Sequence, residues 1–284
     1  MKTEAIGAVT ALCEELRMPA PVAALCARYG QALPEGELEP VIAGLLEPAT
    51  AEAARQEAQR LAKERSTDGL AELFIQLLAA CAARERYRAQ GWSDQVFLDT
   101  MGCFPRFVEE SRRWYGDWRF DRGFWSWRQL SGLLVRLGTL EFERLTLPET
   151  TARLLGLPTG APAISIHIPS DATLTPEALA QAYALRARRI PGDAVYCQTW
   201  LLSPRVGALL PEGSGIRNFQ AGFELVSVDW EDNAGKLWAF GGRELPNETL
   251  PENTSLQRGL KALLLSGQAI GEGLGRLRPE AARA

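Results

Sequence analysis

The sequence holds a single histidine, His167, and this scarcity excludes whole classes of site. A zinc site built on two histidines is impossible, and any reaction that needs an imidazole must use this residue. The five cysteines are scattered and form no Cys-x-x-Cys pair. Such a pattern is typical of reduced thiols in a cytoplasmic protein and not of a disulfide framework or a zinc ribbon. We therefore expect a cytoplasmic protein with no metal site.

Long apolar runs are also missing. No segment approaches the roughly 20 apolar residues that a membrane-spanning helix needs, and Glu14 and Glu15 interrupt the first apolar stretch too early for a signal peptide. The formal net charge of −4 provides no field that would attract nucleic acid or anionic lipid. We expect small-molecule partners, with neither nucleic acid nor a membrane, and we leave a homo-oligomer open.

The length of 284 residues favours two domains, and the composition changes between the two halves. Residues 1–113 are rich in Ala, Leu, Glu and Arg, contain one tryptophan, Trp92, and repeat apolar residues at helical spacing. Prolines and the pair Ser93-Asp94 mark helix breaks and helix starts. We predict five or six short helices that form a helical packing domain over residues 1–115.

Aromatic residues crowd the segment that follows. Positions 114–127 hold Trp114, Tyr115, Trp118, Phe120, Phe124, Trp125 and Trp127. Tryptophan clusters are typical of domain seams and ligand walls, which favours a hydrophobic hinge between the halves. The interleaved arginines would also suit a platform for single-stranded nucleic acid. Nearby acidic residues such as Asp117 and Asp121 weaken that positive field, so we prefer the hinge.

From residue 116 onward strands and helices alternate, which predicts a mixed α/β domain over residues 116–284 and an α+β fold class for the chain. Helices are expected at 124–136, 176–189, 204–220 and 254–266. Strands are expected at 139–147 with a bulge near Arg144, at 163–168, at 194–202 and at 223–230. The turn at 232–235 predicts a hairpin to a further strand at 236–240.

His167 lies at the end of one of these strands. Isoleucines alternate with Ser165 and His167, which is the period of a strand with one apolar face. Pro169 ends the strand, and a polar loop leads to a helix start at Thr175-Pro176. An imidazole at such a strand–loop–helix junction is well placed for chemistry. A histidine that is only hydrogen-bonded into the sheet is the simpler alternative.

Several sequence blocks resemble a known group of proteins. They are Trp125-x-Trp127-Arg128-Gln129, Arg136-Leu137-Gly138-x-Leu140-x-Phe142-Glu143, His167-Ile168-Pro169, Trp200-Leu201-Leu202-Ser203-Pro204, and the run from Ile216 to Glu224 with its Gly-Phe step. Together they are similar to a bacterial group of two-domain proteins that join a helical N-acyltransferase N-terminal domain to a GNAT-like C-terminal domain. The resemblance implies a bacterial acyltransferase with a GNAT-like sheet in the second half of the chain.

The resemblance also implies acetyl-CoA or another acyl-CoA as co-substrate, and an amine-type small-molecule acceptor. In a GNAT-like fold residues 163–168 would splay from 195–202, acyl-CoA would lie in that V, and its pyrophosphate would meet the following loop and helix start. The cofactor-binding residues implied in this way are Ile168, Ser170, Asp171, Ala172, Thr173, Thr175 and Tyr196. The substrate-binding residues implied are Trp125, Trp127 and Trp200.

The chain departs from the usual GNAT pattern in two places. GNAT enzymes place Gln or Arg, two variable residues and then Gly-x-Gly or Gly-x-Ala in the loop, whereas residues 170–175 contain no glycine and include Asp171. A formal match at 268–273 follows a predicted helix, in a glycine-rich tail, and not a strand. The tyrosine expected four residues before the Gly-Phe step is Asn218 here. These departures support a second hypothesis, a catalytically inactive GNAT-like ligand-binding or regulatory protein.

Acyl transfer to an amine needs a base, because the amine arrives protonated, and an acid for the leaving thiolate. His167 is the predicted base. Glu143 and Glu141, on a neighbouring strand, would orient the imidazole or act as the base themselves, and a solvated strand face is the alternative for each. Tyr196 and Tyr183 are weak substitutes for the acid.

Cys197 could act as a nucleophile, but its place on an alternating strand favours core packing. Other enzyme motifs are missing from the sequence, including the Gly-x-Ser-x-Gly elbow, the P-loop, His-Glu-x-x-His and a dinucleotide fingerprint after a strand.

Overall fold

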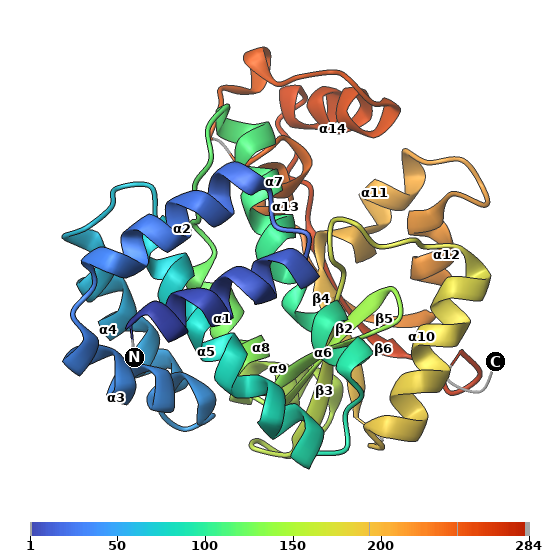
Figure 1. Cartoon of the computed structure of the whole chain (residues 1–284). Coiled ribbons are helices and arrows are strands. Elements are labelled where there is room, and N and C mark those ends of the chain that lie inside the picture. Colours follow the sequence, from blue (N-terminus) through green and yellow to red (C-terminus); the bar gives the residue numbers. More distant parts are fainter. Residues whose placement is uncertain (1, 193, 243, 282–284) are drawn as a thin grey trace. The chain divides into compact units, whose positions relative to one another are not determined.

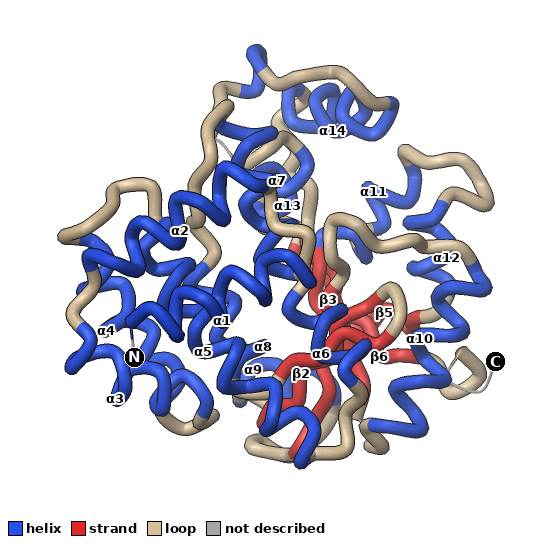
Figure 2. Tube along the Cα trace, viewed as in Figure 1, coloured by secondary structure: helices blue, strands red, loops and turns tan. Residues whose placement is uncertain are grey.

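The computed structural model describes residues 2–192, 194–242 and 244–281 (Figure 1). Its internal contacts divide the chain into two compact units, residues 1–136 and 137–284. The first unit is helical, and the second carries most of a mixed sheet (Figure 2). The α+β class predicted from the sequence is confirmed.

The first unit consists of helices around one buried helix, α5. Its described helices are α1 (Lys2–Glu15), α2 (Ala20–Ala32), α3 (Glu35–Leu46), α4 (Ala51–Lys63), α5 (Leu70–Ala89), α6 (Asp94–Met101), α7 (Cys103–Tyr115) and α8 (Gly123–Leu130). Helix α5 contacts α1, α2, α3, α4 and α8, which is why its leucines and alanines are buried on several sides. Seven described helices precede residue 116 where five or six were predicted, because only Gly102 separates α6 from α7.

Helix α8 packs against α4 and α5 of the first unit. The helix predicted over 124–136 ends at Leu130, and the strand β1 begins at Leu134. Gly132 lies between them with a φ of 73°, a left-handed conformation that stops a helix and suits glycine. The domain boundary predicted after residue 115 stays a prediction.

The sheet has the order β1-β2-β3-β4-β6-β5, and β2 to β6 belong to the second unit, whereas β1 begins in the first. Its strands are β1 (Leu134–Leu137), β2 (Leu140–Thr146), β3 (Pro162–His167), β4 (Val195–Thr199), β5 (Phe223–Asp229) and β6 (Glu272–Leu277). Strand β3 is antiparallel to β2 and parallel to β4, and β6 lies antiparallel between β4 and β5. Four of the predicted strands are therefore confirmed, as β2, β3, β4 and β5.

Strand β6 is the part of the sheet that sequence reasoning missed. From the sequence, residues 268–273 belong to a glycine-rich tail and no strand is predicted after residue 266, because glycine weakens a strand signal. In the structure a Cβ at position 273 would lie 2.7 Å from the carbonyl oxygen of Leu202. Glycine is therefore required at Gly273 so that β6 can pass close to the turn at 200–202.

Two further predictions about the sheet are wrong. Residues 236–240 form no hairpin strand, because Ala234–Ala239 is the helix α13. The bulge predicted near Arg144 is missing from the described β2–β3 ladder, whose register runs without a break from Glu141↔His167 to Thr146↔Pro162.

Helices and short turns flank this sheet. They are α9 (Glu149–Leu155), α10 (Pro176–Arg189), the 3₁₀ turn η1 (Trp200–Leu202), α11 (Pro204–Ala208), α12 (Gly215–Ala221), α13, the 3₁₀ turn η2 (Asn247–Thr249) and α14 (Ser255–Leu265). The helix predicted over 204–220 is thus two helices, α11 and α12. A core cluster that includes Leu155, Ala163 and Tyr196 joins α9 to the sheet. Within the described part of the chain, no helix combines the length and apolarity needed to cross a membrane.

Candidate active site

Strands β3 and β4 separate after a very short parallel ladder. Among the described residues the ladder has two pairs, Ile164↔Val195 and Ser165↔Tyr196. One residue further on, the Cys197 thiol donates to the carbonyl oxygen of Ile166 at 3.1 Å, so a side chain takes over from the backbone ladder. Strand β4 then ends in the turn η1, where the Thr199 hydroxyl accepts from the backbone N–H of Leu201. The backbone ladder between β3 and β4 therefore ends two residues before His167.

The three predicted catalytic residues meet on one face of the sheet. Glu141 is the register partner of His167, and Glu143 is the partner of Ser165, so their side chains share a face. His167 Nε2 lies 2.8 Å from Glu143 Oε2. The His167 side chain is 24% exposed and that of Glu143 is 11% exposed, so the pair is sheltered but still reachable from solvent. The position of these residues follows directly from strand alternation.

Ser165 and Tyr196 continue the polar row on the same face. The hydroxyl of Tyr196 is hydrogen-bonded to the Ser165 side chain, and burial raises the pKa of Tyr196. Tyr196 had been predicted as a cofactor contact, whereas Ser165 had no predicted role. The signal that could have found Ser165 was its spacing of two residues from His167, which puts both side chains on one face.

A second carboxylate lies further along the sheet, on the β4–β6 side. Gln198 Nε2 donates to Glu272 Oε2 at 2.7 Å. Gln198 follows Tyr196 by two residues and therefore shares its face. Burial raises the pKa of Glu272, against the opposing effect of the hydrogen bond from Gln198. Sequence reasoning missed this pair because β6 itself was missed.

The loop after β3 is held in place by short hydrogen bonds. Thr139 Oγ1 accepts from the Thr173 N–H at 2.6 Å and donates to the Thr173 carbonyl at 3.0 Å. The Ala172 N–H donates to the Pro169 carbonyl at 3.0 Å. Of the remaining predicted cofactor residues, Ile168 is half-buried, while Ser170 and Asp171 form an exposed turn. The loop, which contains no glycine, is thus held by the Thr139 hydroxyl and by a backbone turn.

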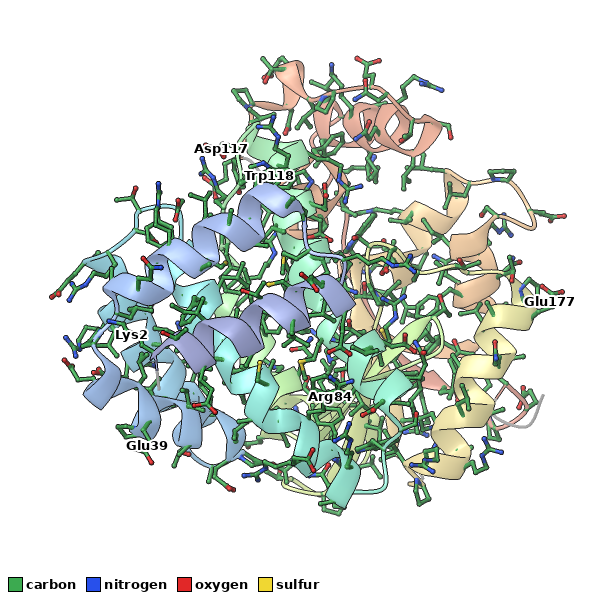
Figure 3. The ribbon with its side chains drawn as sticks, in the orientation of Figure 1. Lys2, Glu39, Arg84, Asp117, Trp118 and Glu177 are labelled. Atoms are coloured by element: carbon green, nitrogen blue, oxygen red, sulfur yellow. The ribbon has the colours of Figure 1, made fainter. Side chains whose placement is uncertain are left out.

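The loop ends at the N-terminus of α10. The Thr175 hydroxyl caps this helix by accepting from the Ala178 N–H at 3.3 Å. A helix N-terminus attracts anions through its free N–H groups and the helix dipole. Glu177, labelled in Figure 3, lies in the first turn of α10 and adds a negative charge close to that end, as Asp171 does in the loop. The N-terminus of α10 can attract a phosphate, but the carboxylates of Glu177 and Asp171 weaken this electrostatic attraction.

The three predicted substrate-binding tryptophans lie in different units. Trp125 and Trp127 belong to α8 in the first unit, where the Arg128 guanidinium stacks on both rings at 4.5 and 4.6 Å. Trp200 lies in η1 of the second unit and packs against a core cluster. A Cβ at Gly235 would lie 2.7 Å from the Trp200 Cβ, which shows how closely α13 approaches this residue. Their contribution to acceptor binding stays a prediction.

Arginines of the aromatic segment stack on its own rings. The Arg119 guanidinium lies 4.5 Å from the Tyr115 ring centre, and the Arg112 guanidinium lies 5.5 Å from that of Trp118, which Figure 3 labels. Cations engaged in this way are less available for phosphates. This internal pairing disfavours the nucleic-acid platform.

Cys197 and Tyr183, the other residues considered for chemistry, are both buried. Burial raises the thiol pKa of Cys197 and the phenol pKa of Tyr183 well above their usual values. A thiol in that state is a poor nucleophile. In the part of the chain that the structure describes, no group of three or more His, Cys, Asp or Glu side chains is arranged to hold a metal ion.

Comparison with known proteins adds family matches and similar solved structures. The N-acyltransferase N-terminal domain model matches residues 8–132, and the GNAT-like C-terminal domain model matches residues 134–277. None of the curated proteins matches the sequence.

Among solved structures, an acyltransferase in complex with decanoyl-CoA and teicoplanin is 22% identical, with a TM-score of 0.68, over 94% of this chain and 87% of that chain. An acyltransferase mutant in complex with octanoyl-CoA is also 22% identical, with a TM-score of 0.69, over 94% of this chain and 86% of that chain. An acyltransferase in complex with decanoyl-CoA is 21% identical, with a TM-score of 0.63, over 95% of this chain and 98% of that chain. At these identities the likeness shows the fold alone.

Proposed function

Because the chain belongs to the GNAT-like C-terminal domain family, and carries an N-acyltransferase N-terminal domain before it, we propose that it transfers an acyl group from acyl-CoA to an amine-type small-molecule acceptor. One observation carries the proposal. The hydrogen-bonded pair His167–Glu143 stands where β3 parts from β4. A base oriented by a carboxylate at the mouth of such an opening is what acyl transfer to an amine requires.

In this proposal His167 removes the proton that the acceptor ammonium carries. With the Nε2 proton directed at Glu143 Oε2, the lone pair of the imidazole lies on Nδ1, which takes the proton directly or through a water. Glu143 holds the ring and stabilises the imidazolium. The amine nitrogen then forms a bond to the acyl carbon while the carbon–sulfur bond breaks and CoA leaves as a thiolate. A thiol with an ordinary pKa near ~8.5 needs little help from an acid to leave.

The donor would be held by the loop and the helix start described above. Ile168 and Tyr196 would line the opening, and Ser170, Asp171, Ala172, Thr173 and Thr175 would surround the phosphates. The three similar structures reported above, which contain octanoyl-CoA or decanoyl-CoA, support a thioester donor and make chains of that length the first to test. A cytoplasmic location and a bacterial source stay predictions.

A catalytically inactive ligand-binding protein is the second candidate. The observation that favours it is the loop at 170–175, which lacks glycine and carries Asp171 beside the proposed phosphates. Such a protein would bind acyl-CoA but would not consume it.

Calorimetry with acetyl-, octanoyl- and decanoyl-CoA tests the donor first, and absence of binding to all three would reject the proposal. A second assay measures release of free CoA in the presence of a set of amines. It distinguishes the acyltransferase from the inactive ligand-binding protein, because only the acyltransferase releases CoA in an amine-dependent way. The variant His167→Ala should bind acyl-CoA like the wild type and release no CoA.

A further inference from the structure

The pair Gln198–Glu272 lies on the polar face of the sheet, beyond the cluster that joins α9 to it. Tyr196 of β4 and Leu274 of β6 are buried in that cluster. Two residues further along β4, Gln198 is exposed, and Glu272 at the start of β6 is half-buried. This pair can therefore be reached from solvent, and the mechanism described above gives it no role.

Gln198 occupies on β4 the position that His167 occupies on β3. Each residue lies two positions beyond the ladder pair Ser165↔Tyr196, and the two strands are parallel. At the intervening position the Cys197 thiol donates to a β3 carbonyl at 3.1 Å, which keeps the strands together there. Paired strands lie roughly 4.8 Å apart, and residues two apart on a strand share a face. His167 and Gln198 therefore project from the same face of the sheet, on adjacent strands.

Glu272 sets the direction of the Gln198 amide. Gln198 Nε2 donates to Glu272 Oε2 at 2.7 Å. An ionised carboxylate can only accept hydrogen bonds, so the amide must present its N–H group to it. The amide oxygen Oε1 therefore points away from Glu272, and no described residue donates to it. Gln198 thus offers a hydrogen-bond acceptor whose orientation is fixed by its neighbour.

A primary amine and an alcohol differ in the hydrogens that remain once a base has acted. A primary ammonium gives one proton to His167 and keeps two N–H groups. As its nitrogen bonds to the acyl carbon and the carbon–sulfur bond breaks, one of these protons leaves with the CoA thiol, and the other stays in the amide product. An alcohol gives its single hydroxyl hydrogen to the base and keeps none. A site built to hydrogen-bond an N–H group rejects an analogue that lacks it.

We propose that Gln198 is a specificity-determining residue of the acyl transfer. Its Oε1 accepts from the N–H group that the acceptor keeps, so the chain acylates primary amines and rejects alcohols. Glu272 is the positioning residue that holds the amide in this orientation. The proposal rests on the proposed function, since it concerns the acceptor that His167 deprotonates and a thioester held between β3 and β4.

Matched amines and alcohols test the assignment. Octylamine and phenethylamine are compared with octanol and phenethyl alcohol, which have the same skeletons, and CoA release at saturating decanoyl-CoA gives kcat/KM for each. Gln198→Met keeps the length of the side chain and removes its acceptor oxygen. It should lower kcat/KM for both amines roughly tenfold, the scale of one hydrogen bond. The values for the alcohols and the KM for decanoyl-CoA should not change.

Variants at position 272 separate orientation of the amide from packing. Glu272→Gln removes the carboxylate that dictates the amide direction, so the preference for amines should fall, but less than in Gln198→Met. The exchanged double variant Gln198→Glu/Glu272→Gln restores a pair of one amide and one carboxylate. It again presents an acceptor oxygen to the nucleophile, so the preference for amines should return at least to the wild-type value. A role in packing alone predicts no such recovery.

Gln268→Met, which removes an exposed glutamine between α14 and β6, is the matched control and should behave like the wild type. An unchanged ratio of amine to alcohol kcat/KM in Gln198→Met would overturn the assignment and leave the proposed function intact. Equal losses for amines and alcohols in that variant would also overturn it, because they indicate a structural role. No CoA release by the wild type with either amine would instead overturn the proposed function.

Discussion

His167 Nε2 lies 2.8 Å from Glu143 Oε2, and the two residues reach this contact diagonally, from neighbouring strands in which they are two register positions apart. The contact needs no loop to form it, because two rigid strands set its geometry. An imidazole held in this way has a fixed ring orientation, which a general base needs.

We therefore expect His167→Ala to lower the turnover of acyl transfer by roughly 10²–10⁴-fold, the usual contribution of a general base. Glu143→Gln should lower it less, because the imidazole remains and loses only its carboxylate partner. Affinity for acyl-CoA should change little in either variant. The measurement is CoA release under saturating donor, with the exposed Glu149→Gln as the charge-matched control. Equal turnover in His167→Ala and the wild type would remove this residue from the mechanism.

Cys197 should be dispensable for chemistry. Its side chain is fully buried and burial raises its thiol pKa, so the thiolate that a nucleophile requires is scarce. We expect Cys197→Ala to keep its turnover and to lose about 1–2 kcal/mol of stability from the small cavity. Urea unfolding and the CoA-release assay measure the two effects. A variant that folds normally but is inactive would show that the thiol takes part in the reaction.

Removal of the negative charge at Glu177 should tighten acyl-CoA binding. The carboxylate lies in the first turn of α10, where it opposes an incoming phosphate. We expect Glu177→Gln to raise the affinity about two- to fivefold at low salt, the scale of one charge near a helix terminus. The gain should shrink at high salt because of screening. The control Glu248→Gln removes an equal charge from η2 and should leave the affinity for acyl-CoA unchanged. An unaltered affinity in Glu177→Gln would argue against phosphates at the N-terminus of α10.

Gly273→Ala should destabilise the sheet. A Cβ at this position would lie 2.7 Å from the Leu202 carbonyl oxygen, so β6 or the turn η1 must move. Overpacking of this kind typically costs about 1–3 kcal/mol. Gly7→Ala is the control, since nothing lies within 4 Å of a Cβ there, and in helix α1 it should be neutral or slightly stabilising. Denaturant unfolding compares the two, and equal stabilities would contradict the close approach.

Glu72 should make the stability of the helical unit depend on pH. The residue is 6% exposed and accepts from Gln76 Nε2 at 3.1 Å, and burial raises its pKa from 4.5 to about 7. The folded state therefore holds a proton that the unfolded state releases between these two values. The stabilisation is complete below pH 4.5 and is lost as pH rises through about 7, a decrease of about 3 kcal/mol.

The measurement for Glu72 is the free energy of unfolding between pH 4 and 8, in the wild type and in Glu72→Gln. The variant has no carboxyl at this position and should show a flatter profile. Identical slopes in the two proteins would contradict a raised pKa at Glu72.

Much of the fold and part of the site follow from local sequence patterns. The alternation of Ser165 and His167 with isoleucines locates β3 correctly. Successive side chains of a strand point to opposite faces, so a strand with one buried face alternates apolar and polar residues. The same rule places Glu141 and Glu143 on one face of β2, and the observed antiparallel register puts Glu141 opposite His167 and Glu143 opposite Ser165. These are short-range consequences of backbone geometry.

What escaped prediction depends on contacts between distant segments. Glycines in residues 272–277 look like a flexible tail until the carbonyl of Leu202 lies against one of them. The pair Gln198–Glu272, separated by 74 positions in the chain, exists only because β6 enters the sheet beside β4. A one-dimensional pattern carries no trace of either relationship.

The position of β6 has a consequence for how the chain acquires its shape during synthesis. Residues 272–277 pair with β4 on one side and β5 on the other, although β5 precedes them by more than forty positions. Until the ribosome has released that segment, β4 and β5 both have exposed edges. Strand β4, the neighbour of the strand that carries His167, then lacks its pairing with β6. The helical unit, made of local contacts, can form earlier. The ability to bind a ligand in the sheet would thus appear only after residues 272–277 have emerged from the ribosome.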